Sequence, residues 1–173
     1  ALGKLEDAAY YESVYDNFKQ AWQSRYVLPD GMTICHTQTS YALGLAFSLF
    51  PEDLADEALL HLLSLLEQSG YQIKTGFSGI SQLFPTLSNY EQFDAAYQLL
   101  LQENYPSLLY PVKQGATTTW ELWQGYSELD NGTYRLGGSF NHYAYGTPAS
   151  FIYSDILGIK SDEAAPGYKH ILL

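Results

Sequence analysis

Apolar residues along this chain recur at the spacing of helices with one buried face. Over residues 6–25 they return close to every 3.6 residues, which predicts an amphipathic helix that ends before the turn at 29–31. Residues 37–50 are apolar on nearly every side, as expected of an inner helix packed against several neighbours. Gly44 lies within this run, where it would let a neighbouring backbone approach closely. The positions of the first helix expected to face a core are Ala9, Val14, Phe18, Ala21, Trp22 and Tyr26.

Three further segments show helical spacing. Pro51 and two acids open a helix that ends near Gly70, since proline and negative charge both favour a first turn. A short helix follows the loop 74–79, and another is predicted over 90–103. The expected buried positions are Leu54, Ala58, Leu62, Leu65 and Leu66 in the first, Leu83, Phe84 and Leu87 in the second, and Phe93, Ala96, Tyr97, Leu100 and Leu101 in the third.

The remaining part of the chain mixes turns with two helical predictions. Residues 117–123 are expected to form a short helical segment, and Asp130-Asn131-Gly132 is a strong turn signal. The glycine pair 137–138 suggests a hinge, with Ser139 capping a helix that runs through about Leu157. Long helices that alternate with short loops predict an all-α fold of consecutive helical hairpins, in one segment covering residues 1–173.

Composition and charge narrow the possible partners. The 173 residues carry 19 acidic and 8 basic side chains, a formal charge of −11, so neither nucleic acid nor an anionic membrane is an expected partner. No apolar run is long enough to span a bilayer, and the first residues do not resemble a secretory signal. The compartment therefore stays open. The lone cysteine, Cys35, cannot form an internal disulfide and is expected to be a small buried residue.

The candidate chemistry is that of a carbohydrate site. Glu121 stands between Trp120 and Trp123, and the string Ser139-Phe140-Asn141-His142 follows. Aromatic rings pack against the C–H faces of sugars, while a carboxylate beside indole rings suits general acid or base work. The plainer alternative is an exposed glutamate beside two packed tryptophans. Glu128 and Asp130 are weaker carboxylate candidates, more simply explained as solvated loop residues.

Metal and phosphate sites are not indicated. His61 has no second ligand at a chelating spacing, so no metal is predicted. The two glycines at 76 and 79 lack the Gly-Lys-Ser/Thr ending of a phosphate-binding loop. Glycoside hydrolysis needs no cofactor, and none is expected.

These strings resemble the signature of the α-L-rhamnosidases whose catalytic domain is an (α/α)6 toroid of six helical hairpins. The resemblance rests on Gly115 to Glu121 with Trp123, on Ser139 to His142, and on upstream and downstream strings that cover most of the chain. It departs at Leu122 and at Ile80-Ser81, where the family often has Arg and Thr-Pro. The further matching strings are Gln38–Tyr41, Leu49–Glu52, Lys74–Gly79, Asp94–Tyr97, Tyr105–Ser107 and Pro166–His170.

The resemblance implies a fold, an activity and site residues. The chain would form roughly half of the toroid, the C-terminal part of an inverting glycosidase that acts on rhamnose-containing glycans or glycosides. It assigns Glu121 as the general base and gives His142 a contact with the sugar; Trp120, Trp123 and Asn141 are further substrate-binding candidates. The family's general acid lies upstream of this chain, so the chain alone would be inactive or nearly so. The absence of an initial methionine fits a piece of a longer polypeptide.

Two alternatives to this activity remain at this point. One is another glycosidase or a polysaccharide lyase on a helical toroid, although few basic residues are available to neutralise an acidic sugar. The other is a non-catalytic helical interaction module. We also expect half a ring to hide its uncovered inner-helix faces, by self-association or against a missing N-terminal part.

Overall fold

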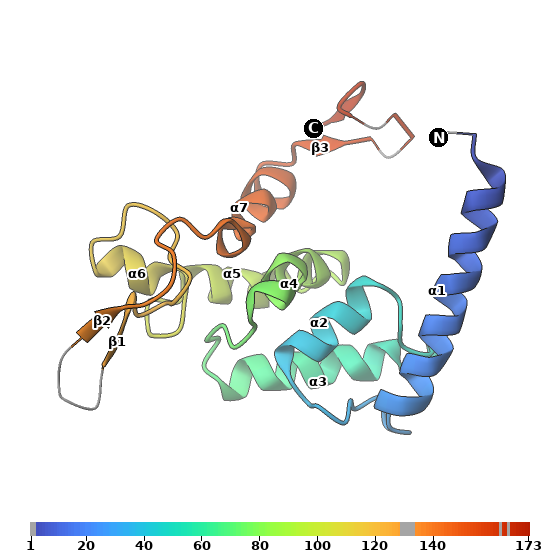
Figure 1. Ribbon diagram of the computed structural model, residues 1–173, viewed down its shortest axis with the longest axis horizontal. Helices are drawn as coiled ribbons and strands as arrows, with labels where there is room; N and C mark the ends of the chain where they lie inside the picture. Colours follow the sequence, from blue (N-terminus) through green and yellow to red (C-terminus); the bar gives the residue numbers. More distant parts are fainter. Residues whose placement is uncertain (1–2, 129–133, 163, 166) are drawn as a thin grey trace.

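A computed structural model describes residues 3–128, 134–162, 164–165 and 167–173 (Figure 1). The described chain is predominantly helical, which confirms the all-α prediction. The main helices are α1 (Leu5–Tyr26), α2 (Gln38–Ala46), α3 (Ala55–Gln68), α4 (Phe77–Asn89) and α5 (Phe93–Leu101). The shorter elements are η1 (Glu52–Leu54), α6 (Leu109–Lys113), η2 (Tyr143–Gly146), α7 (Pro148–Phe151) and the π-helical turn η3 (Ile152–Ile156).

Two small antiparallel hairpins accompany the helices. Strand β1 (Tyr126–Glu128) pairs with β2 (Tyr134–Leu136), and β3 (Lys160–Ser161) pairs with β4 (Ile171–Leu172). The first hairpin projects beside α6, whereas the second lies at the C-terminal end of the chain (Figure 1). Neither strand pair was expected from the periodicity, because strands of two or three residues are too short to show an alternating pattern.

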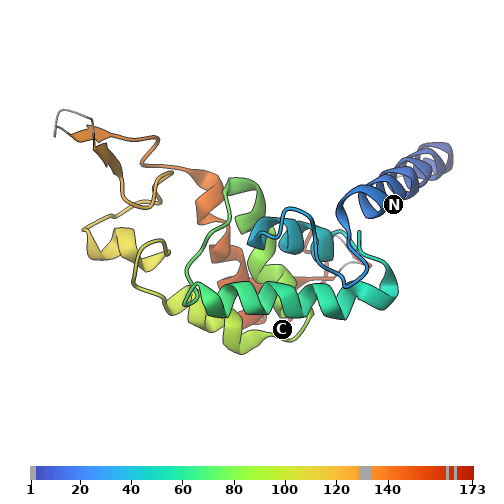
Figure 2. The same ribbon diagram turned by 90° about the horizontal axis from the view of Figure 1, so that it is seen from below.

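The core forms where α2 and α4 lie side by side with α3 against α2 (Figure 2). A capping box of Thr37 and Ser40 begins α2, and α4 carries the largest share of fully buried side chains. Gly44 does allow a close approach, but by aromatic rings rather than by backbone, since a Cβ there would lie 2.5 Å from the Phe50 ring. The buried hydrophobic residues of these three helices are Tyr41, Ala42, Leu45, Ala58, Leu59, Leu62, Leu66, Ile80, Leu83, Phe84 and Leu87.

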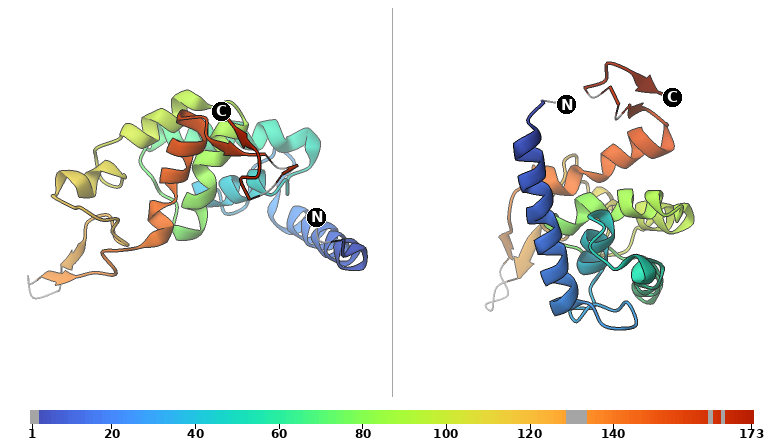
Figure 3. Two further views of the ribbon diagram at one scale, coloured as in Figure 1. Left: turned by 90° about the horizontal axis from the view of Figure 1, so that it is seen from above. Right: turned by 90° about the vertical axis from the view of Figure 1, so that its right-hand side faces the viewer.

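Helix α1 forms as predicted, but its expected buried face is wrong. No residue of α1 is fully buried, and Phe18 is 57% exposed. The helix stands at one side of the molecule and meets the core near its carboxyl end (Figure 3). There Trp22 packs edge-on against Phe50, with 5.0 Å between ring centroids. Cys35, expected to be buried, is exposed in the loop that follows α1.

The predicted buried face of α5 is right only in part. Ala96 is buried and Leu100 packs against the core, as predicted, but Phe93, Tyr97 and Leu101 are exposed. Ala95 and Leu99 are buried in their place. The small side chain of Ala95 allows α5 to approach α4 closely, so alanine takes an inner position that a larger side chain was expected to fill.

The amino-terminal ends of α2, α4 and α7 face the same side of the molecule, as Figure 1 shows. Side-chain contacts support this arrangement. A Cβ on Gly79 of α4 would lie 3.0 Å from Thr39 Oγ1 of α2, and the Phe77 ring lies 6.2 Å from that of His142. The connections before these helices, residues 27–37, 69–76 and the described residues of 102–128 and 134–142, therefore converge on one face.

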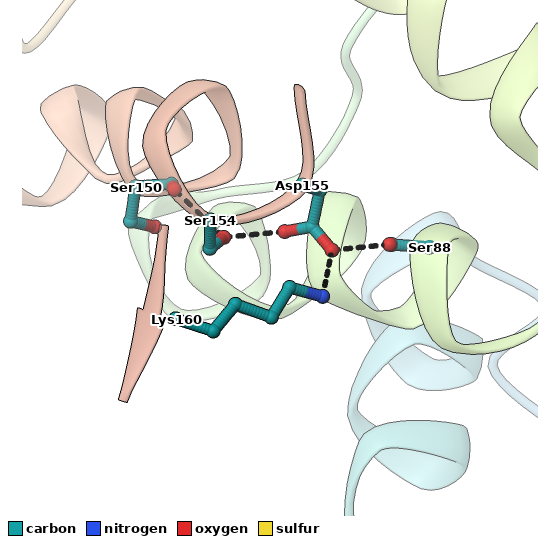
Figure 4. A network of polar contacts seen from close by, with 5 residues as sticks. All are labelled: Ser88, Ser150, Ser154, Asp155 and Lys160. Atoms are coloured by element: carbon teal, nitrogen blue, oxygen red, sulfur yellow. Dashed lines mark hydrogen bonds and ion pairs between the residues drawn. The ribbon is translucent and has the colours of Figure 1, made fainter. Parts of the chain in front are cut away.

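A polar network fastens the C-terminal segment to α4 (Figure 4). Asp155, whose side chain is 9% exposed, accepts hydrogen bonds from Ser88 at 2.5 Å and from Lys160 at 2.9 Å, and a further one from Ser154. Because Ser88 ends α4 and Asp155 belongs to η3, the network joins two elements far apart in sequence. None of the helices in the described part of the chain combines the length and apolar character needed to cross a bilayer.

Candidate active site

The predicted site residues lie on two non-helical segments that are joined by backbone hydrogen bonds. Glu121 N–H donates to the Ser139 carbonyl at 2.8 Å, and His142 N–H donates to the Thr119 carbonyl at 2.9 Å. This pairing continues the β1–β2 hairpin beyond its strands. The short helix predicted over 117–123 is therefore wrong: the backbone groups that a helix would use internally are instead engaged across the pair.

The Glu121 carboxylate is held in place by the backbone of the opposite segment. Its Oε2 accepts a hydrogen bond from Ser139 N–H at 2.7 Å. No residue in the described ranges donates to Oε1, which leaves that oxygen available for a reacting group. Glu121 is thus held through one oxygen, while the other has no donor among the described residues.

Gly138 makes room for this carboxylate. Its backbone has φ +69°, and a Cβ on it would lie 2.7 Å from Glu121 Oε2 and 2.9 Å from Glu121 Cβ. Only glycine fits there without displacing Glu121. The pair Gly137-Gly138, interpreted as a hinge from sequence, is instead a position of close packing. Ser139 does not cap a helix, because the next helical turn begins only at Tyr143; its Oγ accepts the Asn141 N–H at 3.0 Å within the loop.

His142 precedes a helical turn rather than lying within a long helix. The predicted helix from 139 to 157 is broken into η2, α7 and η3, and His142 is the extended residue before η2, with φ −89° and ψ 105°. Its ring lies 5.1 Å from Tyr145 and 5.8 Å from Tyr143. Nδ1 is enclosed and has no hydrogen-bond partner among the described residues.

Tyr145 joins the site from the same helical turn. Its ring packs 4.7 Å from Trp123 and 5.1 Å from His142. Burial and the negative charge of Glu121 both raise the pKa of Tyr145 above its usual value near 10. Tyr145 was not among the site residues predicted from the sequence, although its spacing of three from His142 suits one face of a helical turn.

The two tryptophans take different environments. Trp123 is 9% exposed and belongs to the core, so its ring offers little surface to a sugar. Trp120 is half-buried; its ring contacts Phe140 at 5.3 Å and covers Gly125, where a Cβ would lie 2.5 Å from the indole. Asn141 is exposed.

A cavity of about 370 Å³ adjoins this loop. Its lining includes Trp120, Trp123 and Tyr145 together with apolar residues of α5, α6 and α7, but not Glu121. The carboxylate therefore does not line this cavity.

The other carboxylates and the histidine considered from the sequence add no further site. Asp130 lies outside the described residues, and Glu128 forms the end of β1. Within the residues that the structure describes, no group of three His, Cys, Asp or Glu side chains gathers in a way that could hold a metal ion. His61 contacts the backbone carbonyl of Asp30 through Nε2, at 3.1 Å.

Comparison with known proteins gives a consistent picture. Residues 1–156 match the family model of the bacterial α-L-rhamnosidase six-hairpin glycosidase domain. The chain is 37% identical over 99% of its length to an α-L-rhamnosidase of Streptomyces avermitilis, and 39% identical over 99% to one of Alteromonas sp.. It spans only 16% and 19% of the length of these two relatives.

Solved structures agree with the sequence matches. The S. avermitilis α-L-rhamnosidase complexed with L-rhamnose superimposes with a TM-score of 0.85 at 36% identity, covering 95% of this chain and 16% of that one. The native α-L-rhamnosidase of Aspergillus terreus gives 0.87 at 38% identity, covering 98% of this chain and 20% of that one. Together with the family model, these matches show that the chain belongs to the six-hairpin glycosidase domain family of the bacterial α-L-rhamnosidases.

Proposed function

We propose that the protein containing this chain hydrolyses terminal α-L-rhamnosides with inversion, and that Glu121 is its general base. The observation that carries the proposal is the anchoring of Glu121 Oε2 by Ser139 N–H at 2.7 Å, with no described donor to Oε1. A carboxylate oriented through one oxygen can accept a proton from water through the other. Membership of a rhamnosidase family supports the substrate class.

The reaction needs a second carboxyl group. In an inverting glycosidase one carboxylic acid protonates the leaving oxygen while a carboxylate roughly 6.5–9.5 Å away activates water on the opposite face of the sugar. We place the acid in a part of the polypeptide outside these 173 residues, as the family resemblance implies. The chain alone would then lack half of the catalytic pair and be inactive or nearly so.

The sugar would contact residues on the face that carries Glu121. We assign His142 to a sugar hydroxyl, since its ring lies 5.1 Å from that of Tyr145, whose pKa is raised by the nearby charge of Glu121 as well as by burial. Trp120 is the better of the two stacking candidates because Trp123 is enclosed in the core. Asn141, being exposed, can reach a hydroxyl without rearrangement. The structure gives no specific support to a lyase or to an interaction module.

The test is turnover of an aryl α-L-rhamnoside by the full-length protein and its Glu121→Gln variant. Glutamine keeps a carbonyl oxygen that can accept the Ser139 N–H but cannot take a proton, so kcat should fall by roughly 10²- to 10⁴-fold. Glu103→Gln is the matched control: it removes an exposed carboxylate, 57% accessible, which pairs with Lys113 and forms no hydrogen bond to Glu121 in the described part of the chain.

Three outcomes would contradict parts of the proposal. Normal turnover by Glu121→Gln would remove Glu121 as the base. Release of the α anomer, followed by NMR in the first minutes, would contradict inversion. Turnover by the isolated 173-residue chain would place a second catalytic carboxyl group within it.

A further inference from the structure

A second pocket on the converging face has an unusual charge for this chain. It encloses about 320 Å³ between the start of α2, the end of α3 and the connection 69–76. Six of its seven lining residues are polar and none is acidic, in a protein with 19 acidic and 8 basic residues. The polar lining consists of His36, Thr37, Gln38, Gln68, Ser69 and Lys74.

The pocket is built by a buried amide. Gln38 is 3% exposed, and its Oε1 accepts the Lys74 N–H at 2.8 Å while its Nε2 donates to the Gln72 carbonyl at 3.0 Å. A buried side chain with both ends bonded holds the connection 69–76 against α2. Gln38 therefore determines where Lys74 stands relative to His36.

The two basic side chains remain available to a ligand. Lys74 is exposed and forms no ion pair within the described ranges. His36 is exposed and its Nδ1 lies 2.7 Å from the Tyr41 hydroxyl, which also accepts the Thr33 N–H at 3.2 Å. The Tyr41 proton is best satisfied by donation to Nδ1, which leaves the His36 proton on Nε2 as a donor, beside the His61 ring at 5.9 Å between centroids.

The other polar groups are largely committed to the protein. Ser69 Oγ lies 2.9 Å from the Leu66 carbonyl, Gln68 Nε2 donates to Ser64 at 2.9 Å, and Thr37 belongs to the capping box of α2. What the pocket offers is thus an ammonium and an N–H donor without a competing carboxylate. Such a set recognises an oxyanion.

We propose that this pocket binds an oxyanion on the part of the substrate beyond the rhamnose, a sugar carboxylate or a sulfate ester, through Lys74 and His36. The inference rests on the proposed function, because the pocket lies on the face that carries Glu121 and would select what the rhamnose is attached to. An acidic substrate would otherwise be repelled by a chain of charge −11.

The experiment compares full-length wild type with Lys74→Met on rhamnosyl-glucuronate, rhamnosyl-glucose sulfate and rhamnosyl-glucose. Wild type should prefer at least one acidic substrate, and which one is preferred identifies the source of the oxyanion. Lys74→Met should lose about five- to tenfold in kcat/KM on that substrate, through KM, with neutral rhamnosides unchanged. Lys74→Arg should retain most of the preference.

Lys169→Met is the control for the loss of one positive charge elsewhere and should leave the preference intact. Equal losses on acidic and neutral substrates, or no preference in wild type, would overturn the pocket assignment. If wild type cleaves no rhamnoside, the proposed function fails, and the pocket is then judged by titrating glucuronate and glucose into wild type and Lys74→Met by calorimetry. Equal glucuronate binding by the two proteins, or none by either, would overturn it independently.

Discussion

Gly138 and Glu121 lie so close that any side chain at 138 must displace the carboxylate, because a Cβ there would stand 2.7 Å from Oε2. Gly138→Ala should therefore lower kcat of the full-length protein by about tenfold or more, since small displacements of a catalytic group are costly. It should also destabilise the protein by about 1–2 kcal/mol, because φ is +69°. Both quantities can be measured, by aryl rhamnoside turnover and urea unfolding.

Gly115→Ala separates the two effects. Gly115 has φ +88° and nothing within 4 Å of a Cβ, so alanine should bring the same backbone strain without touching Glu121. We expect a similar loss of stability with kcat nearly unchanged. Equal losses of kcat in the two variants would mean that strain, rather than displacement of the carboxylate, explains the result.

The charge of Glu121 should be detectable at Tyr145. Burial is the larger cause of the raised Tyr145 pKa and the negative charge of Glu121 the second. Glu121→Gln removes only the second cause, so the pKa should fall toward 10 but stay above it. NMR titration of tyrosines labelled at Cζ measures this change directly.

Tyr90 is the internal control for that titration. Its pKa is also raised by burial first, but its neighbouring charge is Asp56. Glu121→Gln should leave Tyr90 unchanged, and Asp56→Asn should lower the pKa of Tyr90 alone. If the pKa of Tyr145 does not change in Glu121→Gln, the charge of Glu121 does not act on Tyr145, which would contradict their proximity.

Asp155 should make stability depend on acid pH. Burial opposes its ionisation, but hydrogen bonds from Ser154, Ser88 and Lys160 and the charge of Lys160 outweigh this and hold the Asp155 pKa below 3.8. The contribution of Asp155 to the free energy of unfolding is therefore complete above the pKa that it has in the unfolded chain. This contribution is lost as the pH falls through the lower pKa of the folded state. Asp155→Asn should cost about 1–3 kcal/mol at pH 7 and progressively less below pH 4.

Unfolding in urea at pH 7 and at pH 3 would test this difference. Glu103→Gln provides the comparison, since the Glu103–Lys113 pair is more than half exposed on both sides and should contribute little. An Asp155→Asn cost that stays constant down to pH 3 would contradict the assigned pKa direction.

Gly44 tests the packing of α1 on α2. A Cβ at 44 would lie 2.5 Å from the Phe50 ring and 2.9 Å from the Trp22 ring. Although alanine favours a helix by about 1 kcal/mol, overpacking of this kind costs about 1–3 kcal/mol, so Gly44→Ala should be destabilising on balance. In a Phe50→Leu background the loss should shrink. Stabilisation in the wild-type background would show that the rings can move aside.

Much of the helical framework could be predicted because helical periodicity is a local property. Helices α2, α3 and α5 fall within predicted segments, α1 is one residue longer than predicted at each end, and α4 begins at Phe77, inside the predicted loop 74–79. Which face of each helix is buried depends on its neighbours, and here the prediction failed for most of α1 and for part of α5. An alanine such as Ala95 adds little to a hydrophobic pattern in the sequence. It is nevertheless buried where another helix approaches closely, because its side chain is small.

The candidate site divides in the same way. Glu121 and His142 could be named in advance because their neighbours in sequence carry the resemblance. The support for Glu121 comes from Ser139 and Gly138, whose roles depend on pairing between segments that no local pattern reveals. Tyr145 was not predicted as a site residue, because its proximity to Glu121 is a property of the folded loop.

The donor that holds Glu121 is a main-chain amide, so the identity of residue 139 matters less than the alignment of the two segments. Lengthening the connection between β1 and β2 would leave that alignment untouched. A single insertion between 137 and 142 would slide one segment by about 3.3 Å and present the wrong amide to the carboxylate. Among relatives, the length of the connection between β1 and β2 should therefore vary freely. The number of residues between 137 and 142 should stay constant, because it aligns the amide with the carboxylate.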